Sequence, residues 1–146
     1  PVMNLIRNFH PLAVAVPHQR GLLQRVRRGT GHHGLPSPVT TVERLGCKYC
    51  GSPRHADIVL ITGPLTARVK DKVLRVWNEI PEPKVTVAVG ICPISGGVFR
   101  EGYSIEGPVD RYLPIDVNVP GCPPRPQAIM EGVLEAVAIW RERMEG

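Results

Sequence analysis

The sequence predicts an α/β protein built on a parallel sheet, because strand-like and helix-like patterns alternate along the chain. Two apolar runs, 58–61 and 85–89, are each closed by glycine and fit strands buried on both faces. Between them, residues 66–80 carry apolar side chains at helical spacing, with Lys and Arg in between. Residues 115–119 alternate as a third strand, and a last helix follows from about residue 124.

Residues 1–41 do not share this organisation. Apart from LAVAV at 12–16, which is compatible with a short strand, they show neither a strand period nor a helix period. They hold five arginines and no Asp or Glu, which accounts for the whole net charge of +5. The remainder is electrically balanced and carries no nucleic-acid-binding motif, so we expect no nucleic-acid partner. We therefore divide the chain into an irregular basic head, 1–41, and an α/β domain, 42–146.

The sequence gives no sign of a membrane span or of export. No run of about 18 apolar residues is present, and no charged-then-apolar leader opens the chain. We therefore expect the cysteines to be reduced, which favours metal binding or redox chemistry over disulfide formation as their role. Burial in the core is the simpler alternative. The four residues concerned are Cys47, Cys50, Cys92 and Cys122.

Two of these cysteines follow predicted strands. Cys92 lies in VGICPISGG after the second strand, and Cys122 lies in VPGCPPRP after the third. Parallel α/β sheets place their sites at the carboxyl ends of the strands, so we expect both thiols at one edge. Each precedes proline and lies close to glycine, which combines close backbone approach with a stiff loop. Such thiolates suit an iron–sulfur cluster, although a [4Fe–4S] cluster normally has four cysteine ligands.

Cys47 and Cys50 form a C-K-Y-C motif with the spacing of a metal-ligand or redox pair. A zinc ribbon would need a second CxxC, which the sequence lacks. A thioredoxin-like motif would need a helix where GSPRHAD follows. We keep both residues as weaker metal candidates, with burial in the core as the alternative.

Three stretches carry a family resemblance: GSPRHADIVLITGPLT, VAVGICPISGG and DRYLPIDVNVPGCPPRPQAIMEGV. Over about residues 42–140 the chain resembles the small iron–sulfur subunit shared by respiratory complex I and energy-converting membrane-bound [NiFe] hydrogenases, including formate hydrogenlyase. GPLT, PRHAD and CPPRPQAI are more similar to the hydrogenase branch. The resemblance implies a flavodoxin-like, three-layer α/β/α fold and a [4Fe–4S] cluster with Cys92 and Cys122 as two ligands.

The resemblance also implies partners and a location. The protein is expected to dock against a large catalytic subunit and other subunits, peripherally, on the cytoplasmic side of the cell membrane. It implies that Arg54 and His55 adjust the charge around the cluster or contact a partner, because the matching region of the quinone branch lies near the cluster. For Arg54, hydrogen bonding to neighbouring backbone is the structural alternative. No residue of this chain is expected to be catalytic on its own.

The family motif C-N-G-C-D, which supplies the other cluster ligands, is absent from the sequence as printed. The codons available from His18 onward, read one base later, can spell T-N-A-G-C-C-N-G-C-D-x-E. Those for 38–41, read two bases later, can spell Arg-Tyr-Asp, which in the family precedes a stretch like VERLG. GC-rich codons that are read out of frame also yield many Arg, Gly, Pro and His residues, which accounts for the composition of this stretch. We therefore interpret residues 9–41 as an out-of-frame translation, caused by small insertions or deletions in the gene or its sequencing. The alternative is a genuine basic head.

The leading interpretation is an electron-transfer subunit of an oxidoreductase complex, whose [4Fe–4S] cluster exchanges electrons with a large subunit of the hydrogenase type. A quinone-reducing subunit of the complex I type is the second interpretation. A cluster-less, degenerate α/β interaction protein is the alternative from another class. It applies if the printed frame is genuine, because two family ligands and a displaced CxxC are not enough for a cluster.

Overall fold

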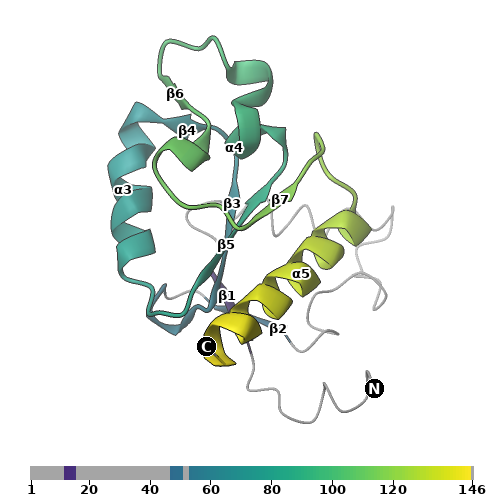
Figure 1. Cartoon of the computed structure of the whole chain (residues 1–146). Coiled ribbons are helices and arrows are strands. Elements are labelled where there is room, and N and C mark those ends of the chain that lie inside the picture. The colour runs from purple at the N-terminus through teal and green to yellow at the C-terminus, as the bar shows by residue number, and fades with distance from the viewer. Residues whose placement is uncertain (1–11, 16–46, 51–52, 146) are drawn as a thin grey trace.

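The computed structural model describes residues 12–15, 47–50 and 53–145, which form a parallel sheet with helices packed against it (Figure 1). The five strands lie in the order β2-β1-β3-β5-β7. Numbered along the chain, this is the order 2-1-3-4-5 of the flavodoxin-like fold, which confirms the predicted fold class. The strands are β1 (Leu12–Ala15), β2 (Cys47–Cys50), β3 (Ile58–Thr62), β5 (Val85–Val89) and β7 (Val117–Val119).

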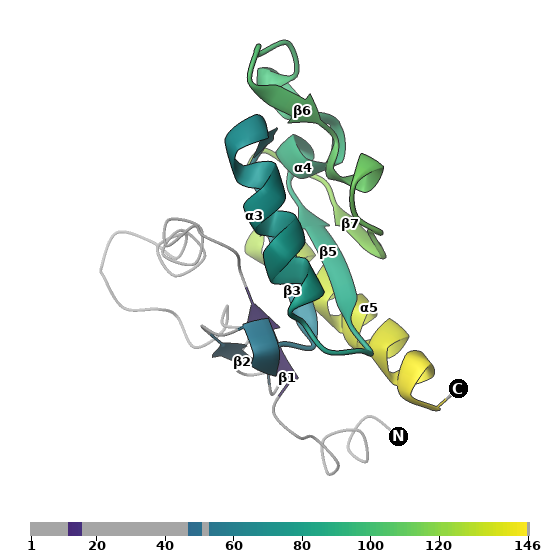
Figure 2. The same cartoon turned by 90° about the vertical axis from the view of Figure 1, so that its left-hand side faces the viewer.

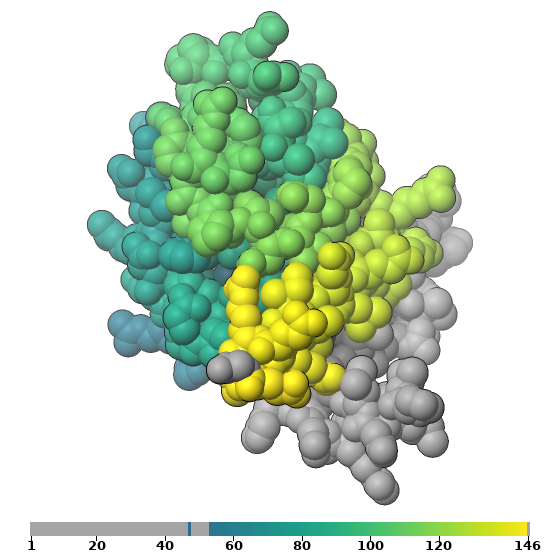
Figure 3. All heavy atoms as spheres, in the orientation of Figure 1, coloured from purple at the N-terminus to yellow at the C-terminus, as the bar shows by residue number. Residues whose placement is uncertain are grey.

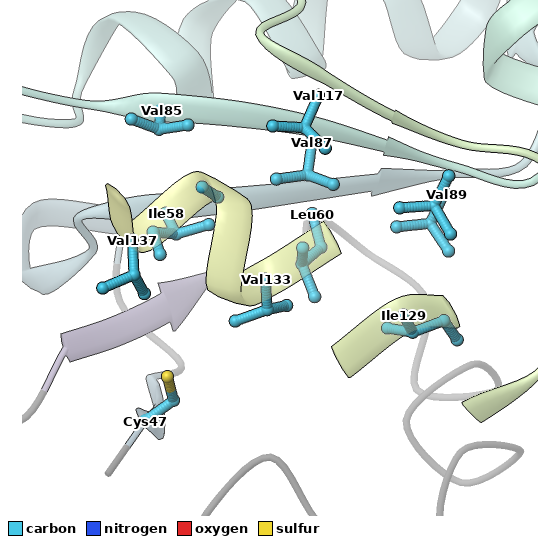
Figure 4. Packing of buried hydrophobic residues seen from close by; sticks show 12 residues of the cluster. Cys47, Ile58, Leu60, Val85, Val87, Val89, Val117, Ile129, Val133 and Val137 are labelled. Atoms are coloured by element: carbon cyan, nitrogen blue, oxygen red, sulfur yellow. The ribbon is translucent and has the colours of Figure 1, made fainter. Parts of the chain in front are cut away.

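Helices cover both faces of the sheet. α3 (Ala67–Asn78) lies on one face and α5 (Pro126–Glu145) on the other (Figures 1 and 2). Successive strand residues point to opposite faces. Ile58 therefore joins the core under α5 (Figure 4), whereas Val59 joins the core under α3. One continuous apolar run fills two cores, as expected for a strand of a three-layer α/β/α protein.

Shorter elements gather around the carboxyl edge of the sheet, at the top of Figure 1. A two-stranded antiparallel sheet pairs β4 with β6, and a short helix, α4, begins two residues after β5. These elements build the part of the molecule that contains Cys92. The remaining bounds are η2 (Pro53–His55), β4 (Leu65–Thr66), α4 (Ile91–Ser95), η3 (Gly97–Phe99), β6 (Ile105–Gly107) and η4 (Val109–Arg111).

The described part of the predicted head adds a strand to the main sheet. Residues 12–15 form β1, which confirms the strand expected in LAVAV, and they pair in parallel with β2 and β3. β2 contains the C-K-Y-C motif and is an outermost strand of the sheet. Most of residues 1–41, and the boundary before residue 42, lie outside the described residues. The division into head and domain, and the out-of-frame interpretation of 9–41, stay predictions.

Gly132 lets α5 pack closely on β7, and a side chain there is expected to force the two apart. Gly132 is buried, and a Cβ built on it would overlap Cγ2 of Val119. Gly132→Val is expected to lower the free energy of unfolding by about 3 kcal/mol, the upper end of the usual range for overpacking. Chemical denaturation followed by circular dichroism measures this loss. Glu131→Val adds the same side chain at the exposed neighbour and is expected to cost less than about 1 kcal/mol; equal costs would contradict the close packing.

Candidate metal centre

Cys92 and Cys122 lie at the carboxyl ends of two neighbouring strands, as the sequence predicts. Cys92 is in α4, just after β5, and Cys122 follows β7. The two strands pair in parallel, with Val89 opposite Val119 at their ends. The topology therefore brings two thiols, one in α4 and one in the loop after β7, to the same edge of the sheet.

Backbone hydrogen bonds join the two cysteine-bearing loops. The amide of Gly90 donates to the carbonyl of Val119 at 2.7 Å, and the amide of Ile91 donates to the carbonyl of Gly121 at 3.0 Å. Gly121 has a φ of +144°, and a Cβ there would lie 2.7 Å from the nitrogen of Pro124. Because only glycine tolerates both this angle and this approach, the PGCPP turn depends on it.

Burial and the neighbouring Cys122 both act on the thiol of Cys92. Cys92 is half-buried, whereas Cys122 is exposed. Burial raises the pKa of the Cys92 thiol, and the charge of Cys122 raises that pKa further. A bound metal cation reverses this preference, because it stabilises thiolates and releases their protons. Ionisation of Cys92 is therefore expected to be coupled to metal binding.

The thiols match the donor chemistry of an iron–sulfur cluster but form only half of a four-cysteine ligand set. Within the described residues, no three His, Cys, Asp or Glu side chains are grouped so that they could hold a metal ion. β1 runs parallel to β3, but Ala15 lies opposite Val59, which in turn lies opposite Thr86 of β5. Because β5 continues from Thr86 to Val89, the end of β1 lies about 10 Å short of the edge that carries Cys92. Two strand spacings, about 10 Å, also separate β1 from β5 across the sheet, so the described part of β1 does not come close to Cys92.

Cys47 lies in the hydrophobic core rather than with the other two thiols. It is 4% exposed and belongs to the same buried cluster as Ile58 and Val137 (Figure 4). Burial raises the pKa of its thiol. β2 is three strand spacings, about 14 Å, from β5, so the structure does not bring Cys47 together with Cys92. Cys50 is the last residue of β2, and its side chain is not among those that the structure describes. Its role as a ligand therefore stays a prediction.

Arg54 and His55 lie at the amino end of β3, whereas Cys92 and Cys122 follow the carboxyl ends of β5 and β7. Both are exposed in η2, which leads into the amino end of β3. β3 has five residues, a length of about 17 Å. The fold therefore does not set these side chains beside Cys92 or Cys122, and the expected contact with a partner stays a prediction.

A partly buried polar network ties the segment after Cys92 to α3. Glu106 in β6 accepts a hydrogen bond from Oη of Tyr112 at 2.7 Å and pairs with Nζ of Lys70 in α3 at 3.2 Å. The ammonium of Lys70 also lies 5.1 Å from the centre of the Tyr112 ring. The hydrogen bond from Tyr112, and then that from Lys70, lower the pKa of Glu106. The network holds β6 against α3.

Glu106→Gln is expected to flatten the acid limb of the stability profile. The pKa of Glu106 is lower in the folded chain than its ordinary value of 4.5, so its ionisation stabilises the fold above that value. This contribution disappears as the pH falls through the folded-state pKa. Denaturant midpoints measured from neutral pH down to about pH 3 test this. Glu101→Gln, which removes an exposed carboxylate nearby, is the control; identical profiles for the two variants would contradict the network's role.

Fold and site together define a class of protein: a flavodoxin-like α/β protein with a pair of thiols at the carboxyl edge of its sheet. Residues 33–136 match the family described as NADH ubiquinone oxidoreductase, 20 Kd subunit. The chain belongs to this family, as the motifs around Cys92 and Cys122 predicted.

Relatives from both predicted branches match the chain. It is 46% identical over 110 residues to a probable membrane-bound hydrogenase subunit of Pyrococcus furiosus, a match covering 75% of this chain and 66% of that protein. It is 41% identical over 108 residues to formate hydrogenlyase subunit 7 of Escherichia coli, covering 74% and 42%. It is 39% identical over 123 residues to an NADH-quinone oxidoreductase subunit of Rubrobacter xylanophilus, covering 81% and 46%. The chain thus spans less than two thirds of the length of these three relatives, which are named as subunits of oxidoreductases.

A solved structure supports the same assignment. The chain resembles a chain in the structure of a membrane-bound sulfane sulfur reductase, an archaeal respiratory membrane complex, with a TM-score of 0.76 and 29% identity. The match covers 97% of this chain and 76% of the other. Among the described residues, no helix is both long enough and apolar enough to cross a membrane.

Proposed function

We propose that this chain is the electron-transfer subunit of a membrane-associated oxidoreductase complex and holds a [4Fe–4S] cluster through Cys92 and Cys122. The observation that carries the proposal is the pair of thiols, in loops joined by backbone hydrogen bonds, at the carboxyl edge of a sheet in a chain of this family. When bound, such a cluster accepts and donates single electrons. Cys92 is half-buried and Cys122 is exposed, so a partner would reach the proposed site from the side of Cys122.

The partner in this proposal is a large catalytic subunit of the hydrogenase type. Three large apolar side chains stand exposed in the segment that follows Cys92, which forms the top of the molecule in Figure 3. Val98 is 82% exposed, Phe99 is 55% exposed and Tyr103 is fully exposed. Exposed apolar side chains in the segment that follows Cys92 favour a protein contact here. Attachment on the cytoplasmic side of the cell membrane, through partners, is part of the proposal.

A quinone-reducing complex of the complex I type is the second candidate. The 39% identity to the NADH-quinone oxidoreductase subunit of Rubrobacter xylanophilus supports it, whereas the 46% identity to the probable membrane-bound hydrogenase subunit of Pyrococcus furiosus favours the first. The two differ in the source of electrons. Anaerobic purification of the complex that contains this chain, followed by electron paramagnetic resonance, tests them. A cluster signal that dihydrogen generates supports the hydrogenase type, whereas one that only NADH generates supports the second candidate. A complex without any cluster signal would contradict both.

The other cluster ligands belong, in this proposal, to the correct reading of residues 9–41. Support comes from the direction of β1, which ends at Ala15 and runs parallel to β3, toward the edge that carries Cys92. The shifted frame spells C-N-G-C-D shortly after that point. Accurate sequencing of the DNA that encodes residues 5–46 tests this reading. A single frame that joins C-N-G-C-D to VERLGCKYC is the expected result. Confirmation of the printed frame would favour the cluster-less interaction protein instead.

A further inference from the structure

The backbone doubles back toward Cys92 immediately after α4. The helix ends at Ser95, and the two glycines that follow have positive φ angles, +85° at Gly96 and +55° at Gly97. The amide of Gly96 donates to the carbonyl of Cys92 at 2.9 Å. This reversal brings Gly97 against the thiol: a Cβ built on Gly97 would lie 3.2 Å from Sγ of Cys92.

The sulfur of Cys92 limits the space beside Gly97. Non-bonded heavy atoms normally settle at about 3.5–4.0 Å, so a methyl group there would displace the sulfur or the backbone. The same Cβ would also lie 3.2 Å from Cγ1 of Ile91 and 3.4 Å from Cα of Cys92. Gly96 differs, because its Cβ would instead meet Cα and Cβ of Arg100, at 3.1 Å and 3.3 Å.

We propose that Gly97 is a positioning residue that fixes the sulfur of Cys92 for metal binding. Because Gly97 has no side chain, its main chain can pack directly against the sulfur of Cys92 and limit where the sulfur lies. Gly96 serves only the turn, because its crowded neighbour is Arg100 rather than the sulfur. The metal-binding part of this inference rests on the proposed function. The packing of Gly97 against the sulfur of Cys92 does not depend on it.

The adjacent glycines provide a matched pair of variants. Gly97→Ala and Gly96→Ala impose the same kind of positive-φ strain, but only the first places a methyl group against the sulfur. The probe is Co²⁺ added to the full chain under anaerobic conditions, followed by thiolate-to-metal charge-transfer absorbance. We expect Gly97→Ala to weaken Co²⁺ binding by about 10-fold to 100-fold, as changes beside a metal ligand commonly do. Gly96→Ala is expected to bind as the wild type does, and Cys92→Ser is the negative control.

A second readout needs no metal. In a Cys122→Ser background, the rate at which iodoacetamide alkylates Cys92 is measured by mass spectrometry of the peptide. In Gly97→Ala the methyl group crowds the sulfur and shifts it by a few tenths of an ångström. We expect this shift to raise the alkylation rate at least about threefold, because alkylation follows thiol exposure. Gly96→Ala is expected to leave the rate unchanged. Gly97→Asn, which tolerates positive φ but retains the Cβ, replaces Gly97→Ala if circular dichroism shows that the alanine variant is unfolded.

The outcomes separate this inference from the proposed function. If the wild type binds no Co²⁺ through its thiols, the proposed metal centre is contradicted, and alkylation alone decides the role of Gly97. If the wild type binds Co²⁺ and the two alanine variants match in affinity and alkylation rate, Gly97 is an ordinary turn glycine and the inference is overturned.

Discussion

Replacing either Cys92 or Cys122 with serine is expected to lower the iron content of the chain at least about tenfold, because even changes around a metal ligand commonly cost 10-fold to 100-fold in affinity. Cys92 in α4 and Cys122 in the loop after β7 lie at one edge of the sheet. The hydroxyl of serine is a much poorer ligand for iron than a thiolate. Iron and acid-labile sulfide, measured after anaerobic purification, give the result. Circular dichroism is expected to remain close to that of the wild type, because Cys122 is exposed and Cys92 only half-buried.

Cys47→Ser provides the matched control for these two substitutions. Cys47 is buried in the core under α5, where a serine hydroxyl replaces a thiol in apolar surroundings. We expect this variant to lose stability while retaining its iron. Loss of iron from Cys47→Ser at unchanged stability, with iron retained in Cys92→Ser, would mean that the C-K-Y-C motif is the metal site.

Gly121→Ala is expected to lower the free energy of unfolding by about 3 kcal/mol or more, from backbone strain and overpacking together. Its φ of +144° is outside the range that alanine readily adopts, and its Cβ would overlap Cα of Pro124. The carbonyl of Gly121 also accepts the hydrogen bond from Ile91 that joins the two cysteine loops. Loss of the turn is therefore expected to lower the iron content as well. Chemical denaturation and iron analysis of the same preparation measure both effects.

Pro120→Ala controls for disturbance of the same loop. Pro120 is exposed. Its replacement mainly increases the conformational entropy of the unfolded chain, which lowers the free energy of unfolding by about 0.4–1 kcal/mol. We expect it to retain its iron. If Gly121→Ala behaves in the same way as Pro120→Ala in both measurements, the glycine turn does not hold the site together.

The main strands and both long helices could be predicted from the sequence, because their residues face uniform environments. The runs in β3 and β5 are continuous because both faces of each strand are covered by helices. Sequence patterns mislead where an element ends. The alternation of 115–119 predicts that Ile115 shares a face with Val117, but Ile115 lies before the start of β7 and packs in the core under α3. Helical spacing places Met144 in the apolar stripe of α5, yet it is 57% exposed near the end of the helix.

The candidate site was predictable in its cysteines but not in its supporting residues. Glycine and proline around Cys92 and Cys122 indicated close backbone approach in the sequence. They did not reveal which of Gly96 and Gly97 faces the sulfur, because that depends on the three-dimensional course of the turn. The network of Lys70, Glu106 and Tyr112 joins side chains up to 42 residues apart, and no local pattern indicates it. The CxxC spacing of Cys47 suggested a metal ligand, yet its position in β2 is a core position.

Iron and acid-labile sulfide, measured in the anaerobically purified chain with its complex, decide whether this protein holds a cluster. We expect the stoichiometry of one [4Fe–4S] cluster per chain, and a brown absorbance that dithionite bleaches and that Cys92→Ser and Cys122→Ser both remove. A metal-free chain whose Cys92 and Cys122 thiols are both freely alkylated would contradict the proposed electron-transfer role. The protein would then be an α/β interaction subunit without a cluster.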